Sequence, residues 1–335
     1  MRKGWLICAG IIVVLVVGYF LGPHPSRPVY DPSLPVVPAD PAVLDQYVAA
    51  GEASHHVKPD NQARIIWKDS LHPGKTPFVL LYLHGFSASQ EEGNPVDLDF
   101  AARYGCNLFL SRLSEHGIDT PDAMINLTAD GLWNSAKQAY VLARQLGDSV
   151  IIMGTSTGGT LALQLAATYP NDPIKALILM SPNIAINNSA AWLLNDPWGL
   201  QIARGVMKSK FYGKADTSAL INQYWNTPYR LEALTQLEEL LETKMTPATF
   251  AAVHQPTLLL YYYKDEQHQD PTVKVSAEKQ MFDELGTRAE LKKSVDIPDA
   301  GSHVLGCYLT SHDLPSVQKA VNGFATNVLH LTPSN

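Results

Sequence analysis

One serine of this chain lies in a sequence context that is typical of a reactive hydroxyl. Ser156 is the centre of a Gly-x-Ser-x-Gly pattern, with the apolar run 150–153 before it and a helical pattern over 160–169 after it. A strand, a tight turn and a helix in this order form a nucleophile elbow, which exposes the serine hydroxyl. Gly154 and Gly158 suit the turn because side chains there would collide with neighbouring backbone. The pattern predicts Ser156 as a nucleophile, although short glycine-serine turns also occur without function.

A histidine near the end of the chain is the predicted base. His303 closes a Pro-Asp-Ala-Gly-Ser-His loop that follows the strand-like run 290–297. A loop histidine at this place can reach a nucleophile from far along the chain and accept its proton. His312 is the competitor, but it lies beyond the loop and is expected to begin the last helix, over 313–329.

Two aspartates compete for the role of the acid that would orient His303. Both follow the apolar strand pattern over 255–263. Spacing counted from the start of that strand selects Asp265, whereas an Asp-x-x-Val pattern counted back from the following helix selects Asp270. We favour Asp270, because the valine of this pattern would pack the loop. Asp265 is the alternative acid, and Glu266 is a third candidate.

A second apolar strand pattern, over 77–83, runs into a His-Gly pair. With serine, acid and histidine in this chain order, the sequence resembles the α/β-hydrolase superfamily, and within it bacterial carboxylesterases, monoglyceride lipases and serine aminopeptidases. The resemblance implies a mostly parallel sheet flanked by helices, with an inserted helical cap. It also implies that the backbone N–H groups of Phe86 and Thr157 form the oxyanion hole. His84 is expected to stabilise its loop rather than to act in catalysis.

A further loop, at 111–117, also supports the resemblance. Its sequence is similar to the R-x-x-G-H-G loop of monoglyceride-lipase-like and serine-aminopeptidase-like hydrolases, with Glu115 in place of the first glycine. We expect Arg112 and His116 to fix this loop and not to take part in the reaction.

The order of elements predicts a core that is interrupted once. Strand patterns alternate with helical patterns over 61–182 and 250–335, as in an α/β core with a parallel sheet. Between them, over 183–249, this alternation stops and helical patterns predominate, which resembles a cap over the active site. Three tryptophans lie in this segment: Trp192, Trp198 and Trp225. They would either line an acyl pocket or form the core of the cap itself.

Residues 1–22 are predicted to be an N-terminal membrane anchor. No charge interrupts 5–21, two basic residues precede it, and about 17 residues is the lower limit for a transmembrane helix. Because no small-residue cleavage site follows, we expect an uncleaved signal anchor with the catalytic domain on the extracytoplasmic, periplasmic side. Residues 23–60 are predicted to be a Pro-rich tether and lead-in, since the seven prolines in 23–41 favour an extended segment.

The composition excludes several other classes of protein. The 335 residues suffice for one large α/β domain with an insertion, and the net charge of -7 gives no electrostatic reason to bind nucleic acid. Three scattered cysteines, Cys8, Cys106 and Cys307, form neither a disulfide framework nor a zinc site. We expect the latter two to be buried free thiols.

We interpret the chain as a serine hydrolase of the carboxylesterase type, which cleaves a small-molecule ester through an acyl-enzyme and needs no metal or organic cofactor. The alternative is a serine aminopeptidase-like peptidase, in which Asp196 or Glu232 of the cap would meet the substrate amine. An alternative from another class is a membrane-tethered binding protein on an inactive hydrolase scaffold. The sequence does not indicate an oligomeric state.

Overall fold

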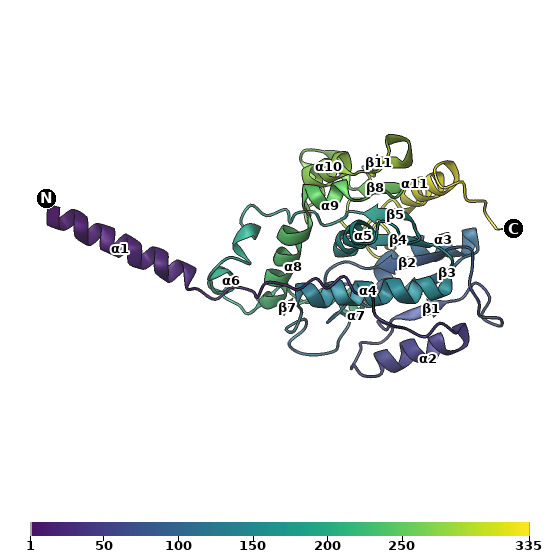
Figure 1. The fold of residues 1–335 in the computed structure, drawn as a ribbon, viewed down its shortest axis with the longest axis horizontal. Coiled ribbons are helices and arrows are strands. Elements are labelled where there is room, and N and C mark those ends of the chain that lie inside the picture. Colours follow the sequence, from purple (N-terminus) through teal and green to yellow (C-terminus); the bar gives the residue numbers. More distant parts are fainter. Residues whose placement is uncertain (1, 335) are drawn as a thin grey trace.

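A seven-stranded sheet forms the centre of the molecule (Figure 1). The computed structural model describes residues 2–334, with the backbone alone for residues 2–4 and 6–9. The strand order is β1-β3-β2-β4-β5-β8-β11; β1 runs antiparallel to β3, and the other neighbouring strands run parallel. This confirms the predicted α/β architecture. The strands are β1 (Arg64–Ile66), β2 (Val79–Leu83), β3 (Asn107–Leu110), β4 (Val150–Thr155), β5 (Ile174–Met180), β8 (Thr257–Tyr261) and β11 (Lys292–Asp296).

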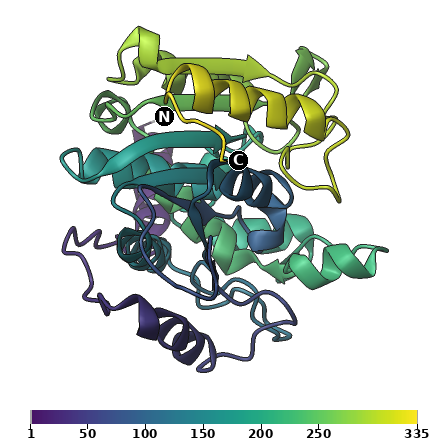
Figure 2. The ribbon, with the colours of Figure 1, turned by 90° about the vertical axis from the view of Figure 1, so that its right-hand side faces the viewer.

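Helices cover both faces of this sheet, which explains the continuous apolar runs of its central strands. All five residues of β2 are buried. Leu81 and Leu83 belong to a core shared with α4 and α5, whereas Leu80 and Tyr82 belong to a core shared with α3 and α11. Helices α3 and α11 lie side by side on that second face (Figure 2). The bounds are α3 (Val96–Tyr104), α4 (Ala129–Leu146), α5 (Thr157–Thr168) and α11 (Leu314–Asn327).

The segment 183–249, defined here as the cap segment, is mainly helical, as the sequence predicts. It joins β5 to β8 and contains α6 (Gly199–Met207), the strand pair β6 (Phe211–Tyr212) and β7 (Tyr229–Arg230), α7 (Ala219–Tyr224) and α8 (Leu231–Lys244). Helix α9 (Pro247–Ala251) begins within the segment and ends two residues beyond it. Trp192 is 53% exposed and Trp198 is 41% exposed, so neither forms a core of this segment. The division of the chain into core and cap domains stays a prediction.

The Pro-rich segment predicted as a tether has no regular secondary structure over 23–40, and it lies against the domain. The backbone carbonyl of Asp31 accepts hydrogen bonds from Trp133 Nε1 (2.9 Å) and Lys137 Nζ (2.7 Å), both on α4. The carbonyl of Pro32 accepts one from the Tyr169 hydroxyl at 2.8 Å. Proline lacks an N–H group but leaves carbonyls free, and here the carbonyls in this segment bind side chains of the domain. The segment then leads into α2 (Pro41–Glu52).

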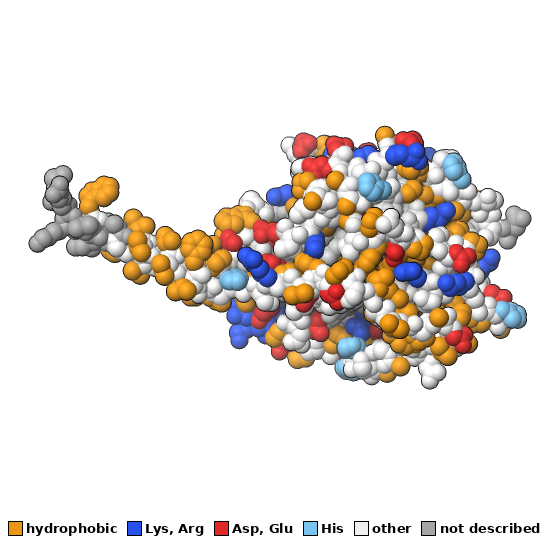
Figure 3. All heavy atoms as spheres, viewed as in Figure 1, with side chains coloured by type: hydrophobic (Ala, Val, Ile, Leu, Met, Phe, Trp, Pro, Cys, Tyr) orange, Lys and Arg blue, Asp and Glu red, His pale blue; other side chains and the backbone are white. Residues whose placement is uncertain are grey.

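Helix α1 (Arg2–Phe20) extends away from the sheet, and its described side chains are largely apolar and exposed (Figures 1 and 3). Among the described residues, no helix combines the length and the apolar character needed to cross a membrane. This finding does not support the predicted anchor. The side chains of Arg2, Lys3 and Cys8 lie outside the described residues. The extracytoplasmic location stays a prediction.

Candidate active site

Ser156 lies at a sharp turn between β4 and α5. Its backbone adopts φ 52° and ψ −117°, a conformation that is uncommon for a residue other than glycine. A Cβ added to Gly158 would lie 1.9 Å from the carbonyl oxygen of Leu83, and one added to Gly154 would lie 2.6 Å from the Gly158 backbone. The Ser156 N–H donates to the Met180 carbonyl of β5 at 3.0 Å. The turn therefore has the geometry of a nucleophile elbow, and both flanking glycines are required by close backbone approach.

His303 lies in the loop after β11 and contacts one of the two candidate acids. Its Nδ1 is 2.6 Å from Oδ2 of Asp270, whose side chain is fully buried. The other carboxylate oxygen of Asp270 accepts the backbone N–H groups of Thr272 (2.8 Å) and Val273 (3.1 Å). Val273 is itself buried, as the Asp-x-x-Val pattern predicts. Asp270 is therefore held in one orientation while it accepts the Nδ1 proton of His303.

The pKa values of this pair move toward the charged forms. Burial alone would raise the pKa of Asp270, but the charge and hydrogen bond of His303 and two backbone N–H groups lower it below its ordinary value. Burial alone would lower the pKa of His303, but the charge and hydrogen bond of Asp270, together with the charge of Glu92, raise it. The raised pKa means that the imidazolium is stabilised, and this is the form that a histidine takes when it accepts a proton as a general base.

The other two candidate acids lie elsewhere. Asp265 has an exposed side chain whose Oδ1 lies 2.8 Å from Nδ1 of His268. Glu266 is exposed and accepts a hydrogen bond from the Tyr263 hydroxyl at 2.9 Å. A small antiparallel strand pair, β9 (Tyr263–Asp265) and β10 (His268–Gln269), lengthens the loop between β8 and Asp270. This inserted pair explains why the two ways of counting give different aspartates.

Ser156 and His303 line one cavity of about 600 Å³. The cap segment forms its opposite wall through apolar side chains on α6 and α8, including Ile202, Val206 and Leu237. Of the three tryptophans of the cap segment, Trp225 lines this cavity. His312 is not among the lining residues of the described chain. The predicted nucleophile and base therefore open into the same apolar space.

The predicted oxyanion donors border the elbow. Thr157 is the first residue of α5, where a backbone N–H has no intrahelical acceptor. Among the described residues, no hydrogen-bond partner occupies the N–H of Phe86. The ring of His84 accepts the Leu113 N–H at Nε2 (3.0 Å), so we assign its proton to Nδ1, which donates to the Gly85 carbonyl at 2.9 Å. That carbonyl belongs to the same peptide unit as the Phe86 N–H, so His84 fixes the direction of this N–H.

The loop after β3 is held as expected for a structural element. Arg112 binds Glu52 through Nε at 2.6 Å and the His116 carbonyl through a guanidinium nitrogen at 3.2 Å. Burial lowers the pKa of His116 to about 4, which keeps the ring neutral. Glu115 adopts φ 64°, a left-handed conformation that accounts for the glycine found here in the resembling hydrolases.

Sequence reasoning missed a buried carboxyl beside the elbow. Glu92 lies in a short 3₁₀ turn, η1 (Gln90–Gly93), is 2% exposed and lines the same cavity as Ser156. One of its oxygens accepts the Gly85 N–H at 2.5 Å. The signal that could have found it is a pair of consecutive glutamates in the loop directly after the His-Gly strand.

Comparisons with known proteins place this geometry in a family. A model of the alpha/beta hydrolase fold matches residues 79–284. A thermostable monoacylglycerol lipase of Bacillus sp. (strain H-257) is 28% identical over 152 residues, which cover 43% of this chain and 60% of that protein. The chain thus spans less than two thirds of that relative's length.

Solved structures show a similar fold at low sequence identity. One of them comes from a study of LipS and LipT, two metagenome-derived lipolytic enzymes. It gives a TM-score of 0.63 at 16% identity, over 80% of this chain and 98% of that one. A monoacylglycerol lipase of Paleococcus ferrophilus gives a TM-score of 0.56 at 14% identity, with the same two coverages. Because the family model matches more than half of its length, the chain belongs to the alpha/beta hydrolase fold family.

Proposed function

We propose that this protein is a serine hydrolase that cleaves carboxylic esters with a hydrophobic acyl chain. One observation carries the proposal. The Ser156 elbow and the imidazole of His303 open into one cavity, and His303 Nδ1 lies 2.6 Å from the buried carboxylate of Asp270. A nucleophile, a base and an orienting acid in this relation constitute the machinery of acyl transfer.

The reaction would proceed in two steps. His303 takes the Ser156 proton while the serine oxygen bonds to the ester carbonyl carbon, and the carbonyl oxygen becomes an oxyanion held by the N–H groups of Phe86 and Thr157. His303 then gives its proton to the departing alcohol as the carbon–oxygen bond breaks, leaving an acyl-enzyme. Water repeats the sequence, releases the carboxylic acid and returns the proton to Ser156. Asp270 holds the ring tautomer throughout.

The cavity supports an apolar acyl group as substrate. Its cap wall carries apolar side chains, and its volume of about 600 Å³ is within the range of sites for small organic ligands. The bacterial relative is named a monoacylglycerol lipase. We therefore extend the proposal to esters of the monoacylglycerol type.

A peptidase activity has less support. Of the two cap carboxylates that could meet a substrate amine, Asp196 accepts a hydrogen bond from Tyr19 at 3.2 Å. Glu232 is bound by both Arg204 and Arg230, each at 2.5 Å. Neither carboxylate lines the cavity that contains Ser156. An ester substrate has no amine that a carboxylate must bind, so it fits the apolar cap wall of the cavity better than a peptide substrate does.

The test compares ester and amide substrates on the purified protein and on Ser156→Ala. We expect turnover of p-nitrophenyl esters and monoacylglycerols, little turnover of aminoacyl anilides, and a loss of at least about 1,000-fold in the variant. A fluorophosphonate probe should label the wild type and not the variant. Absence of labelling in a folded wild-type protein would favour the binding-protein alternative, and preferential turnover of the anilides would favour the peptidase.

A further inference from the structure

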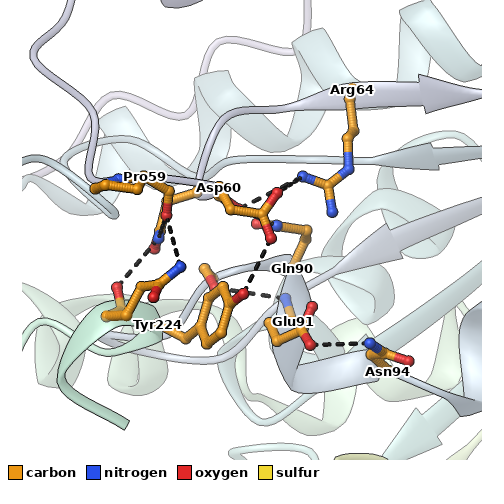
Figure 4. Close-up of polar contacts among 10 residues, drawn as sticks. Pro59, Asp60, Arg64, Gln90, Glu91, Asn94 and Tyr224 are labelled. Atoms are coloured by element: carbon orange, nitrogen blue, oxygen red, sulfur yellow. Dashed lines mark hydrogen bonds and ion pairs between the residues drawn. The ribbon is translucent and has the colours of Figure 1, made fainter. Parts of the chain in front are cut away.

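The short turn that carries Glu92 is fixed by a polar network on its outer side (Figure 4). Gln90 Nε2 donates to the Asp60 carbonyl at 2.5 Å, and the Asp60 carboxylate binds Arg64 at 2.6 Å. The same carboxylate accepts the hydroxyl of Tyr224, from the cap segment, at 3.0 Å. Two other parts of the chain, residues 60–64 and α7 of the cap segment, therefore meet at η1 and hold it in place.

On its inner side, η1 directs Glu92 toward the reacting groups. Its carboxylate accepts the Gly85 N–H. A Cβ added to Gly85 would lie 2.8 Å from a Glu92 oxygen and 3.1 Å from Cβ of Ser156. Gly85 thus separates the carboxylate from the serine by a single backbone layer, and Glu92 lines the same cavity as Ser156 and His303.

The surroundings of Glu92 let its charge act on His303. Burial raises the pKa of Glu92 to about 7, although the Gly85 N–H, His303 and Tyr82 each favour its charged form. In turn, the charge of Glu92 contributes to the raised pKa of His303, after the larger contributions of Asp270. The other titratable groups around this cluster are Asp97 of α3, Cys307 of the last loop and Glu91 of η1.

We propose that Glu92 is a positioning residue of the active site, which holds the backbone that leads to the Phe86 donor and places a second carboxyl beside His303. The inference rests on the proposed serine-hydrolase function. Asp270 accepts the Nδ1 proton of the imidazole, whereas Glu92 would act through the field of its charge and through the Gly85 N–H. Its two effects are separable, because an amide can accept the hydrogen bond without carrying the charge.

The first experiment needs no substrate. The titration of the His303 imidazole is followed by NMR in the wild type, in Glu92→Gln and in the control Glu91→Gln. Glu91 is on the same turn, but its carboxylate binds Asn94 at 2.9 Å instead of Gly85 (Figure 4). We expect the midpoint to fall by about half a pH unit or more in Glu92→Gln, because a neighbouring negative charge favours the imidazolium. The control should titrate like the wild type.

The second experiment separates the hydrogen bond from the charge by kinetics. Glu92→Gln should retain kcat within about threefold at its optimum, with the acid limb of kcat/KM moved to lower pH. Glu92→Leu leaves the buried Gly85 N–H without an acceptor, so kcat should fall about tenfold or more while KM changes little. A merely structural role would not move the acid limb.

The outcomes distinguish the inference from the function on which it rests. Superimposable titrations of His303 in the wild type and Glu92→Gln, with full kcat in Glu92→Leu, would overturn the inference. If Glu92→Leu does not fold, the titration and the acid limb of Glu92→Gln decide. A shifted titration in a wild-type protein that cleaves no ester would support the electrostatic coupling and refute the proposed function.

Discussion

The two walls of the cavity are built in different ways. On the sheet side, Ser156 and Asp270 are held by backbone hydrogen bonds, and the His303 ring is held by Asp270. On the cap side, α6 contributes apolar side chains that are partly open to solvent, with Ile202 45% and Val206 75% exposed. Backbone hydrogen bonds and close packing permit almost no displacement, whereas a half-exposed apolar surface tolerates changes of shape.

Under the proposed function, this difference implies separate tasks for the two walls. Acyl transfer depends on sub-ångström placement of a few polar atoms, which the ends of a parallel sheet can provide. Selection among acyl chains depends on the volume and apolar character of a surface, which the cap segment can provide. Substitutions on the sheet side should therefore change rates by orders of magnitude, and substitutions on the cap side should change preferences by about tenfold.

The largest effect is expected for the acid on the sheet side. Asp270→Asn should lower kcat by about a thousandfold or more, because the amide favours the wrong tautomer of His303. Asp265→Asn, only five positions away, should leave kcat within about twofold, since its exposed carboxylate binds His268 instead. Steady-state kinetics on a p-nitrophenyl ester at the pH optimum measures both. A loss confined to Asp265→Asn would reverse the assignment of the acid.

A pair of glycines gives the next largest contrast. Gly158→Ala should destabilise the protein by about 1–3 kcal/mol or more, because its Cβ would lie 1.9 Å from the Leu83 carbonyl oxygen of β2. Gly205→Ala, on α6, has open space around its Cβ and should stabilise the helix by up to about 1 kcal/mol. Urea unfolding of the two variants measures the difference. Equal destabilisation would show that α6 is packed as tightly as the elbow.

The sequence predicted best those features that backbone geometry imposes. The glycines of the elbow and the apolar run of β2 follow from close backbone approach and from burial on both faces, which few residue types satisfy. The helical character of the cap segment was also predicted, since apolar residues recur there at helical spacing. A pattern of residue types is enough to predict a feature when only one local conformation fits that pattern.

Features that depend on distant contacts could not be predicted. The strand pair that lengthens the acid loop is only a few residues long and has no apolar pattern, so spacing alone left Asp265 and Asp270 in competition. The Pro-rich segment carries no periodicity, and its docking depends on donors at Trp133 and Lys137 more than 90 residues away. Glu92 lies in a polar stretch of sequence that is typical of an exposed loop, and only the tertiary structure buries it.

The cap side should respond in its preference for chain length. Ile202→Trp places a larger side chain at the cavity wall and should lower kcat/KM for a dodecanoate ester by about tenfold, with the acetate ester within about twofold. Leu220→Trp is the matched control, because Leu220 is 44% exposed on α7 and does not line the cavity. Equal losses on both esters would mean that Ile202 affects the reacting groups and that the two walls are not separate.

The smallest expected effect concerns a buried carboxyl of the cap segment. Burial and the charge of Glu242 raise the pKa of Glu238 on α8 to about 7, although Lys274 opposes the shift. The folded state therefore holds this proton more tightly than the unfolded chain does, whose pKa is near the ordinary 4.5. Stability from this group is complete below about pH 4.5 and is lost as pH rises toward 7. Glu238→Gln should abolish that loss.

The variant should match the wild type near pH 4.5 and exceed its unfolding free energy by about 1 kcal/mol at pH 8, after allowance for residual solvent screening. Glu242→Gln, an exposed neighbour on the same helix, should gain less at pH 8. Urea unfolding at both pH values provides the measurement, and activity should be unchanged because Glu238 does not line the cavity. A gain of equal size at both pH values would mean that packing, and not the buried charge, limits the stability of the cap segment.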